Sequence, residues 1–236
     1  MKTAIVTGAS RGIGAATAVL LAGKGYKVAV NYNNSREKAD AVVNTILKNG
    51  GEAVAIQADM GKEADILRMF ETVDKKWGAI SALVNNAAVN SVGAVEEISY
   101  KTLEDIYRVN VFGVFTACRE AVKHMKANGG AIVNVSSEAA KFGGNNMAAY
   151  ASSKAAVNTF SIGFAREVAR HNIRVNVVSP GIIYTDAKAT VTPERLASIP
   201  MGRMGKPEEV AETIAWLLFD AASYVSGSIV GVTGAR

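Results

Sequence analysis

A phenol and an ammonium group stand four residues apart, at Tyr150 and Lys154, where an Ala-rich segment with a helical pattern begins. Residues four apart on a helix share a face, so both side chains can reach the same ligand. Ser137 precedes Tyr150 by thirteen residues and follows the apolar run "AIVNVS", which is typical of a buried strand. In a doubly wound sheet, this strand end and the start of the next helix meet at one crevice. The three side chains therefore indicate proton transfer at a substrate oxygen.

The Tyr-x-x-x-Lys spacing occurs a second time, at Tyr184 and Lys188. That pair follows "SPG" in a predicted loop, where helical spacing need not apply. His171, and not a hydroxyl residue, stands thirteen positions before Tyr184. The first pair is therefore the better catalytic candidate, although each of its residues taken alone also fits a structural role.

A glycine-rich turn, "TGASRGIG", joins the first predicted strand to the first predicted helix and contains Gly8, Gly12 and Gly14. Glycine permits tight-turn dihedral angles and a close approach of the backbone to phosphate. The N-terminus of the following helix supplies free N–H groups and partial positive charge for a pyrophosphate. The turn therefore predicts a dinucleotide site, and a ligand-free strand–helix corner is the alternative. No G-K-[ST] follows, which argues against a P-loop nucleotidase.

The end of the second predicted strand decides which nicotinamide cofactor fits. An NAD site needs an acidic residue there for the ribose 2′-hydroxyl, but "VAVNYNNSR" contains none, and Tyr32 occupies the expected place. Arg11 in the glycine turn, together with Asn33, Asn34, Ser35 and Arg36 after the strand, offers charge and donors to a 2′-phosphate. We therefore expect NADP(H) in preference to NAD(H).

Short β-branched runs alternate with amphipathic segments along the whole chain. The runs are nearly continuous in Val, Ile and Ala, as in strands that are covered on both faces. They lie at 3–7, 27–32, 52–57, 81–86, 131–136, 174–179 and 228–232. Besides the helix that opens at the glycine turn, helices are predicted at 37–47, 64–77, 100–128, 150–171 and 208–219. This alternation predicts an α/β fold in one domain over 1–236: a Rossmann-like, doubly wound, mostly parallel seven-stranded sheet with helices on both faces. The late connection 181–207 is the expected substrate loop.

Composition excludes several classes of protein. Hydrophobic residues make up 49% of the 236 residues and charged residues 20%, which is enough for a large core. The net charge of +5 comes from scattered residues without a basic run, so we expect no nucleic-acid partner. Cys118 is the one cysteine and reads as a buried apolar residue. The N-terminal apolar run is too short for a secretory signal, and no stretch approaches the roughly 18 apolar residues of a membrane helix. We expect a cytoplasmic protein without a membrane segment and without a metal site.

Taken in order, the motifs resemble those of the short-chain dehydrogenase/reductase family nearly from end to end. The matching motifs are "TGASRGIG", "ADM" with Asp59, "NNAA" at 85–88, Asn110 in "RVNVFG", Ser137, Tyr150, Lys154 and "SPGIIYTD" at 179–186. The resemblance implies a catalytic tetrad of Asn110, Ser137, Tyr150 and Lys154. It also implies adenine contacts near Asp59 and a nicotinamide held by Pro180, Gly181, Ile183 and Thr185. The full set of expected cofactor contacts is Gly8, Ser10, Arg11, Gly12, Ile13, Gly14, Tyr32, Asn33, Asn34, Ser35, Asp59, Met60, Asn86, Ala87, Tyr150, Lys154, Pro180, Gly181, Ile183 and Thr185.

The chemistry implied is hydride transfer between NADP(H) and a carbonyl or alcohol. Tyr150 would be general acid in reduction and general base in oxidation, and Ser137 would donate to the substrate oxygen. Lys154 would bind the nicotinamide ribose, and with the oxidised ring it is expected to lower the pKa of the phenol. Asn110 would hold a water of the proton relay.

The substrate is less well determined. The segment "IPMGRMGKPEEVAETIAWLLFDAASYVSG" resembles 3-oxoacyl-[acyl-carrier-protein] reductases, although sugar and steroid dehydrogenases share it. An acyl carrier protein is acidic and would need a basic rim beside the active site. Lys123, Lys126 and Arg170 are candidates for this rim, and ordinary solvated helix ends are the alternative for these three residues. A sugar, polyol or other secondary-alcohol dehydrogenase is the alternative within the family, and a non-catalytic nucleotide-binding regulator is the alternative outside it. The resemblance further implies a homotetramer or homodimer.

Overall fold

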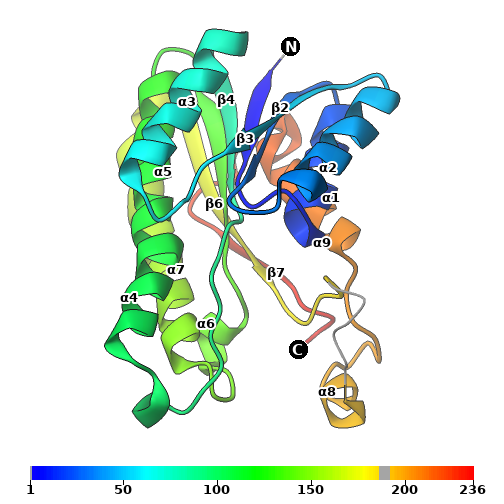
Figure 1. The fold of residues 1–236 in the computed structure, drawn as a ribbon, viewed down its shortest axis with the longest axis vertical. Helices are drawn as coiled ribbons and strands as arrows, with labels where there is room; N and C mark the ends of the chain where they lie inside the picture. The colour runs from blue at the N-terminus through cyan, green and yellow to red at the C-terminus, as the bar shows by residue number, and fades with distance from the viewer. Residues whose placement is uncertain (1, 186–191) are drawn as a thin grey trace.

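The fold is built on one seven-stranded sheet in which every neighbouring pair of strands is parallel (Figure 1). The computed structural model describes residues 2–185 and 192–236. The strand order is β3-β2-β1-β4-β5-β6-β7, so the chain winds outward from β1 in one direction and then from β4 in the other. The order reverses between β1 and β4, which is where ligands bind in open α/β sheets.

All seven predicted strands are present, each within one residue of its predicted bounds. They are β1 Thr3–Val6, β2 Lys27–Tyr32, β3 Glu52–Gln57, β4 Ile80–Asn85, β5 Gly130–Val135, β6 Ile173–Pro180 and β7 Ile229–Val232. The central strands are buried along nearly their whole length, which explains their continuous apolar sequences.

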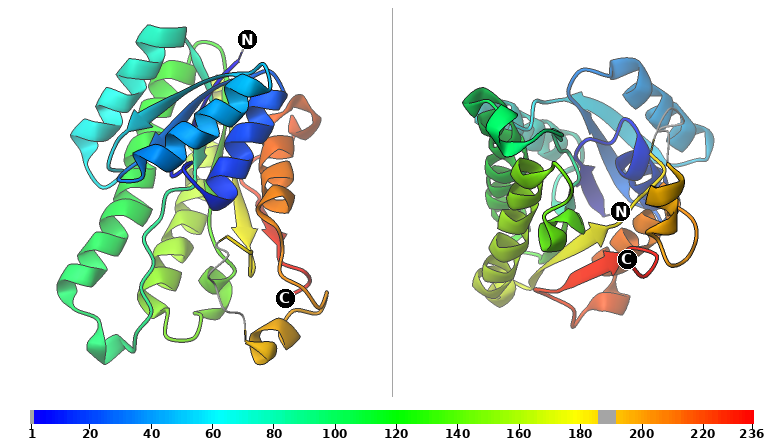
Figure 2. Two further views of the ribbon diagram at one scale, coloured as in Figure 1. Left: turned by 45° about the vertical axis from the view of Figure 1, so that its right-hand side comes forward. Right: turned by 90° about the horizontal axis from the view of Figure 1, so that it is seen from below.

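Helices cover both faces of the sheet and enclose two apolar cores (Figures 1 and 2). One face carries α1 Gly12–Gly23, α2 Arg36–Lys48 and α9 Pro207–Leu218. The other carries α3 Glu63–Trp77, α5 Val114–Met125 and α7 Ala148–Val168. The predicted doubly wound, single-domain fold is therefore confirmed.

The predicted helix 100–128 is not one regular α-helix. It consists of α4 Tyr100–Tyr107, a π-helical segment, η2, at Arg108–Gly113, and α5, which ends at Met125. At η2 the backbone comes so close to the loop after β3 that a Cβ at Gly113 would overlap the Met60 carbonyl oxygen. The helix ends early because the Gly129 N–H bonds back to the Met125 carbonyl, at 2.8 Å, with Gly129 at φ +73°.

The remaining elements are short. They are α6 Ala139–Phe142, α8 Pro193–Ala197, and the 3₁₀ turns η1 Val95–Glu97, η3 Ala169–His171 and η4 Asp220–Ala222. The predicted loop 181–207 thus contains α8, and a parallel bridge joins Ile183 to Gly205. Asp186 and Lys188, which the sequence motifs include, lie outside the described residues. Among the helices described, none is both long and apolar enough to cross a membrane.

Candidate active site and cofactor cleft

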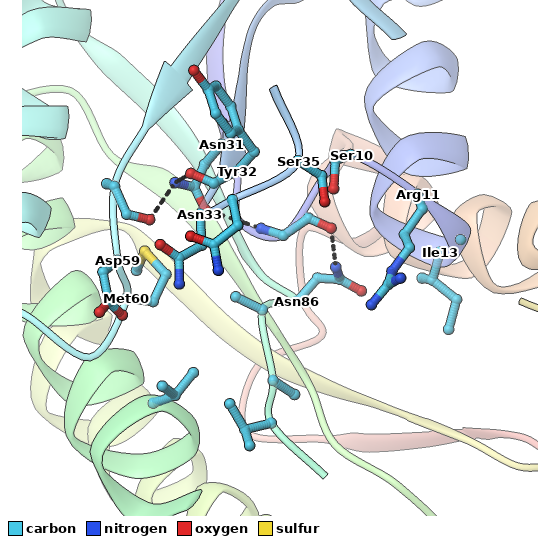
Figure 3. Close-up of a pocket in the computed structure, with 18 of the residues that line it drawn as sticks. Ser10, Arg11, Ile13, Asn31, Tyr32, Asn33, Ser35, Asp59, Met60 and Asn86 are labelled. Carbon is cyan, nitrogen blue, oxygen red and sulfur yellow. Dashed lines mark hydrogen bonds between the residues drawn. The ribbon is translucent and has the colours of Figure 1, made fainter. Parts of the chain in front are cut away.

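A cavity of about 650 Å³ lies at the carboxyl ends of the central strands (Figure 3). It is formed by the glycine turn and by the segments that follow β2, β3 and β4. Its walls contain fourteen of the predicted cofactor residues: Gly8, Ser10, Arg11, Gly12, Ile13, Tyr32, Asn33, Asn34, Ser35, Asp59, Met60, Asn86, Ala87 and Thr185. The cavity is large enough for a dinucleotide-sized ligand.

The glycine turn approaches the segment after β4 more closely than a side chain would allow. Gly8 has φ +61°, and a Cβ there would lie 2.8 Å from the Ala87 Cα. Gly14 does not line the cavity. It lies beneath the turn, where a Cβ would be 2.5 Å from the Gly8 carbonyl oxygen. Helix α1 then begins at Gly12 with no acidic residue in its first turn, so its free N–H groups can receive phosphate.

Asn31 holds the glycine turn in place, and the sequence analysis missed it. Its Oδ1 accepts a hydrogen bond from the Gly8 N–H at 3.0 Å. Its Nδ2 lies near the carbonyls of Tyr32, Ile56 and Ala58, at 3.1–3.4 Å. One fully buried amide therefore ties together the ends of β1, β2 and β3. The sequence contained a signal for this role, because an Asn within the apolar strand "VAVNY" is expected to be buried and must then have hydrogen-bond partners.

Thr7 and Asn86 form a second fastening on the other side of the turn. The Thr7 hydroxyl accepts from the N–H groups of Asn86 and Ala87, both at 3.0 Å. The Asn86 amide donates to the carbonyls of Thr7 and Gly8 at 3.0 and 3.1 Å, and the second of these bonds is visible in Figure 3. Thr7 was also missed from the sequence. The shape of the glycine turn is thus fixed by the buried side chains of Asn31 and Thr7 and by the half-buried side chain of Asn86.

The end of β2 carries no carboxylate into the cavity. Tyr32 occupies the expected acidic position and is buried in the core. Asn33 and Asn34 are exposed, Ser35 is half-buried, and all three line the cavity. Arg11 is exposed, also lines the cavity and has no ion-pair partner within residues 2–185 and 192–236 (Figure 3). A phosphate on the ribose would meet donors here and no negative charge.

Tyr150 lies in the first turn of α7 and faces the hydroxyl of Ser137, which follows β5. Burial raises the pKa of the Tyr150 phenol above its ordinary value, and the nearby Ser137 hydroxyl acts in the opposite direction. The expected lowering of this pKa is therefore not a property of the chain by itself, because desolvation outweighs the other influences. A neutral phenol at neutral pH is the form that can donate a proton.

Lys154 lies one helical turn after Tyr150 and is 98% buried. Its ammonium is 5.8 Å from the centre of the Tyr150 ring and donates to the Val135 carbonyl at 2.8 Å. Burial lowers the pKa of Lys154 to about 8. The lysine is thus held rigidly beneath the phenol, at the end of β5.

Asn110 lies within η2 and is completely buried. Its side chain accepts from the Val89 N–H at 2.8 Å and donates to the Val89 carbonyl at 2.9 Å. It also donates to the Ser153 hydroxyl at 3.0 Å, and that hydroxyl donates to the Tyr150 carbonyl at 2.7 Å. These bonds connect a cavity-wall residue, Val89, to the first turn of α7. The side-chain amide of Asn110 is therefore occupied by protein partners.

The residues expected at the nicotinamide have different surroundings. Thr185 lies against the glycine turn, where a Cβ on Gly12 would come within 3.3 Å of it. Gly181 packs against the Thr233 backbone, and its N–H bonds to the Val232 carbonyl at 3.0 Å. Pro180 is buried at the end of β6, and Ile183 packs on the core. Of the four, Thr185 lines the cavity.

Six expected contacts do not line the cavity: Gly14, Tyr150, Lys154, Pro180, Gly181 and Ile183. The cavity also has wall residues beyond the expected set: Asn31, Ala58, Ala88, Val89 and Val109. Gly14 lies on α1, Tyr150 and Lys154 lie on α7, and Pro180, Gly181 and Ile183 lie at or just after the end of β6.

The basic residues predicted to form a rim beside the active site lie at the wrong end of the sheet. Lys123 is in the last turn of α5, and Lys126 follows it, just before β5 begins. Arg170 precedes β6. Ser137 follows the other end of β5, so within one chain this prediction is wrong. Lys126 precedes β5 and Ser137 follows it, so the two residues lie at opposite ends of that strand although they are close in sequence.

The comparisons with known proteins agree with this geometry. The sequence model of the short chain dehydrogenase family matches residues 2–196. The "Uncharacterized oxidoreductase YgfF" of Escherichia coli is 45% identical, over the full length of both chains. A 3-oxoacyl-[acyl-carrier-protein] reductase of Synechocystis is 40% identical, over 99% of this chain and 96% of the relative.

A solved structure has the same fold. It is a short chain dehydrogenase from Burkholderia cenocepacia in complex with NADP, 33% identical, with a TM-score of 0.93 over 99% of this chain and 96% of that one. The parallel seven-stranded sheet, the glycine turn at its switch point and these full-length matches lead to one conclusion. The chain belongs to the short-chain dehydrogenase/reductase family of oxidoreductases.

Proposed function

We propose that this protein is an NADPH-dependent carbonyl reductase in which Tyr150 is the general acid. The observation that carries the proposal is the placement of Tyr150: its phenol faces the Ser137 hydroxyl, above a buried Lys154. A proton donor and a hydroxyl donor that face each other can both reach one carbonyl oxygen.

NADP(H) is proposed as the cofactor because its distinguishing phosphate would meet Arg11 and the donors after β2. The NADP complex of the Burkholderia cenocepacia relative supports this choice. When bound, NADPH supplies the hydride for the carbonyl carbon. The proposed contacts are those predicted from the sequence, with Asp59 and Met60 at the adenine and Lys154 at the nicotinamide ribose.

The residues of this chain have distinct tasks in the proposed reduction. Ser137 donates a hydrogen bond to the carbonyl oxygen, where negative charge develops. Tyr150 then gives its proton to that oxygen. The Lys154 ammonium stabilises the tyrosinate that remains, since opposite charges at this separation attract strongly in a dry site. Asn110 braces the cavity wall at Val89 and the first turn of α7, which keeps Tyr150 in position.

3-Oxoacyl thioesters are among the proposed substrates, because the Synechocystis relative carries that activity in its name. Large apolar side chains are also exposed on segments that follow β4, β5 and β6, at the same end of the sheet as Tyr150. They include Val92 and Val95 after β4, Phe142 on α6 and Tyr184 after β6. These side chains favour an apolar acyl or aryl ketone over a phosphorylated sugar. Residues 181–207 are proposed to form the loop that covers the substrate.

A second copy of this chain is proposed as a partner, in a homodimer or homotetramer. Phe112 and Phe115 are 61% and 55% exposed on η2 and α5. Phe115 also packs on Phe160 of α7, with ring centres 5.0 Å apart. Exposed aromatic side chains gathered on one helical face are typical of a protein interface.

The function is tested by following NADPH oxidation with a panel of ketones, sugars and 3-oxoacyl thioesters, with NADH in parallel. We expect turnover of at least one apolar ketone or thioester, with a lower KM for NADPH than for NADH. Tight NADPH binding without turnover of any compound would favour a nucleotide-binding regulator. A clear preference for NADH would contradict the proposed cofactor.

The role of Tyr150 is tested with Tyr150→Phe, which keeps the ring and removes the proton. We expect kcat for reduction to fall by roughly 10² to 10⁴-fold, the usual contribution of a general acid, while the Kd for NADPH changes little. Tyr224→Phe is the matched control, since Tyr224 is fully exposed and does not line the cavity. Activity of Tyr150→Phe within about tenfold of wild type would remove Tyr150 from the mechanism.

A further inference from the structure

Arg108, the first residue of η2, reaches from the helical layer to the loop after β3. Its Nη1 lies 3.4 Å from the Gly61 carbonyl oxygen and 3.6 Å from Oδ2 of Asp59. Its Nη2 lies 3.3 Å from Oδ1 of Asp105. The Arg108 side chain also packs against Gly61, where a Cβ would be 2.8 Å from Nη1. The Arg108 side chain therefore contacts the loop at Asp59 and Gly61, and α4 at Asp105.

The loop that Arg108 holds forms the cavity wall at Asp59 and Met60 (Figure 3). Oδ1 of Asp59 accepts from the Gly61 N–H at 2.9 Å, and the Asp59 N–H donates to Asp65 at 3.0 Å. Arg108 contacts the other oxygen, Oδ2. The orientation of the Asp59 carboxylate thus depends on the loop for one oxygen and on Arg108 for the other.

Arg108 itself does not line the cavity. Its side chain and that of Asp59 are 36% and 16% exposed, so the pair is partly shielded from water. Ion pairs near a surface contribute little to folding stability. An effect of Arg108 is therefore expected in ligand affinity more than in folding.

We propose that Arg108 is a positioning residue for the adenine end of the cofactor. It acts through Asp59, whose carboxylate it holds in the orientation that receives the adenine ring. The proposal rests on the proposed function, because Asp59 is an adenine contact there. Because η2 also carries Asn110, the same six residues brace the adenine wall and the wall at Val89.

The test uses Arg108→Met, which keeps the apolar stem and removes the guanidinium, and Arg108→Lys, which restores a charge. The control is Lys101→Ala: Lys101 pairs with the same Asp105 carboxylate, at 2.6 Å, without an ion pair to Asp59. The probe is adenosine 2′,5′-bisphosphate, a fragment of NADPH without the nicotinamide, titrated by calorimetry. Thermal melting checks that each variant is folded.

We expect Arg108→Met to weaken the fragment's Kd about tenfold, the equivalent of one charged hydrogen bond. KM for NADPH should rise by a similar factor, with a smaller change in kcat. Arg108→Lys should recover part of the affinity, because a point charge cannot make all three contacts. Lys101→Ala should bind the fragment within about twofold of wild type.

A double-mutant cycle with Asp59→Asn shows whether Arg108 acts through Asp59. If it does, adding Arg108→Met to the Asp59→Asn variant should raise the Kd of the fragment by less than about twofold. Equal fragment affinity in wild type and Arg108→Met would overturn the proposal. So would a double variant whose loss of fragment affinity equals the sum of the losses in the two single variants. Absence of fragment binding to the wild type would overturn the adenine site and this proposal with it. Absence of turnover alone would overturn the proposed function and leave the fragment measurement as a valid test.

Discussion

Lys154 is a buried lysine whose ammonium loses most of its hydration on folding. Burial lowers its pKa to about 8 in the folded protein, from an ordinary value of 10.5. Below about pH 8 the Lys154 amine is protonated in both the folded and the unfolded protein, and the folded protein carries the full free-energy cost of desolvating the ammonium. Between these two pKa values the unfolded chain binds more protons than the folded one, so this group makes the protein more stable as pH rises.

This sign gives a prediction for Lys154→Met, which removes the titrating group. From about pH 7 to about pH 10, the unfolding free energy of wild type should rise relative to the variant by roughly 2 kcal/mol. The measurement is urea unfolding of both proteins at both pH values. Lys24→Met, at an exposed lysine, is the control. A wild-type-minus-variant difference that stays flat with pH would contradict the assignment of a depressed pKa to Lys154.

Residues that could perform proton chemistry were predictable from the sequence, because their types and spacing are restrictive. Tyr150, Lys154 and Ser137 carry that signal in their order along the chain. Asn31 and Thr7 were missed because they act on the backbone of the cavity and not on a ligand. A polar residue inside a strand reads as an interruption until its buried partners are known.

At the scale of elements, the π-helical segment η2 determines how close two parts of the cavity wall come. Gly113 ends η2 and touches the Met60 carbonyl, with no room for a Cβ. Gly163 lies within α7, where a Cβ would meet nothing within 4 Å. The two glycines are therefore a matched pair, one in a tight contact and the other in open space.

We expect Gly113→Ala to destabilise the protein by about 1–3 kcal/mol or more, since η2 must move away from Met60. Gly163→Ala should instead stabilise it by roughly 0.5–1 kcal/mol, the difference in helix propensity. Thermal unfolding of both variants measures the contrast. Similar melting temperatures for the two variants would mean that the close approach at Met60 is not needed for folding.

The strands were predictable because seven short runs are nearly continuous in Val, Ile and Ala. Such runs place apolar side chains on both faces of a strand, and both faces are buried only in a sheet covered by helices on each side. The break at η2 was not, since its apolar residues continue the pattern of the flanking helices. The prediction of a basic rim beside the active site failed for a geometric reason. Lys126 and Ser137 are close in sequence, but β5 separates them by its whole length.

At the scale of the whole molecule, the exposed aromatic face on η2 and α5 gives a prediction about assembly. Phe115→Asp would place a charge where the proposed interface is apolar, so we expect the oligomer to dissociate or weaken markedly. Light scattering coupled to size-exclusion chromatography measures the mass. Phe142→Asp, at an aromatic residue of α6 that is 69% exposed, is the control. A monomeric wild type, or an unchanged mass for Phe115→Asp, would rule out this face as the interface.

The buried amide of Asn31 also limits how the protein could be redesigned. Its oxygen and nitrogen are both committed to backbone groups of three strand ends, so a replacement would disturb the cavity before it altered any ligand contact. Engineering a different nucleotide preference should therefore begin two residues further along, at Asn33 to Ser35. The side chains of these residues do not make the hydrogen bonds that hold the strand ends together. Within the five consecutive positions from Asn31 to Ser35, the first must therefore be kept for the shape of the cavity, and the last three can be varied to change the ligand.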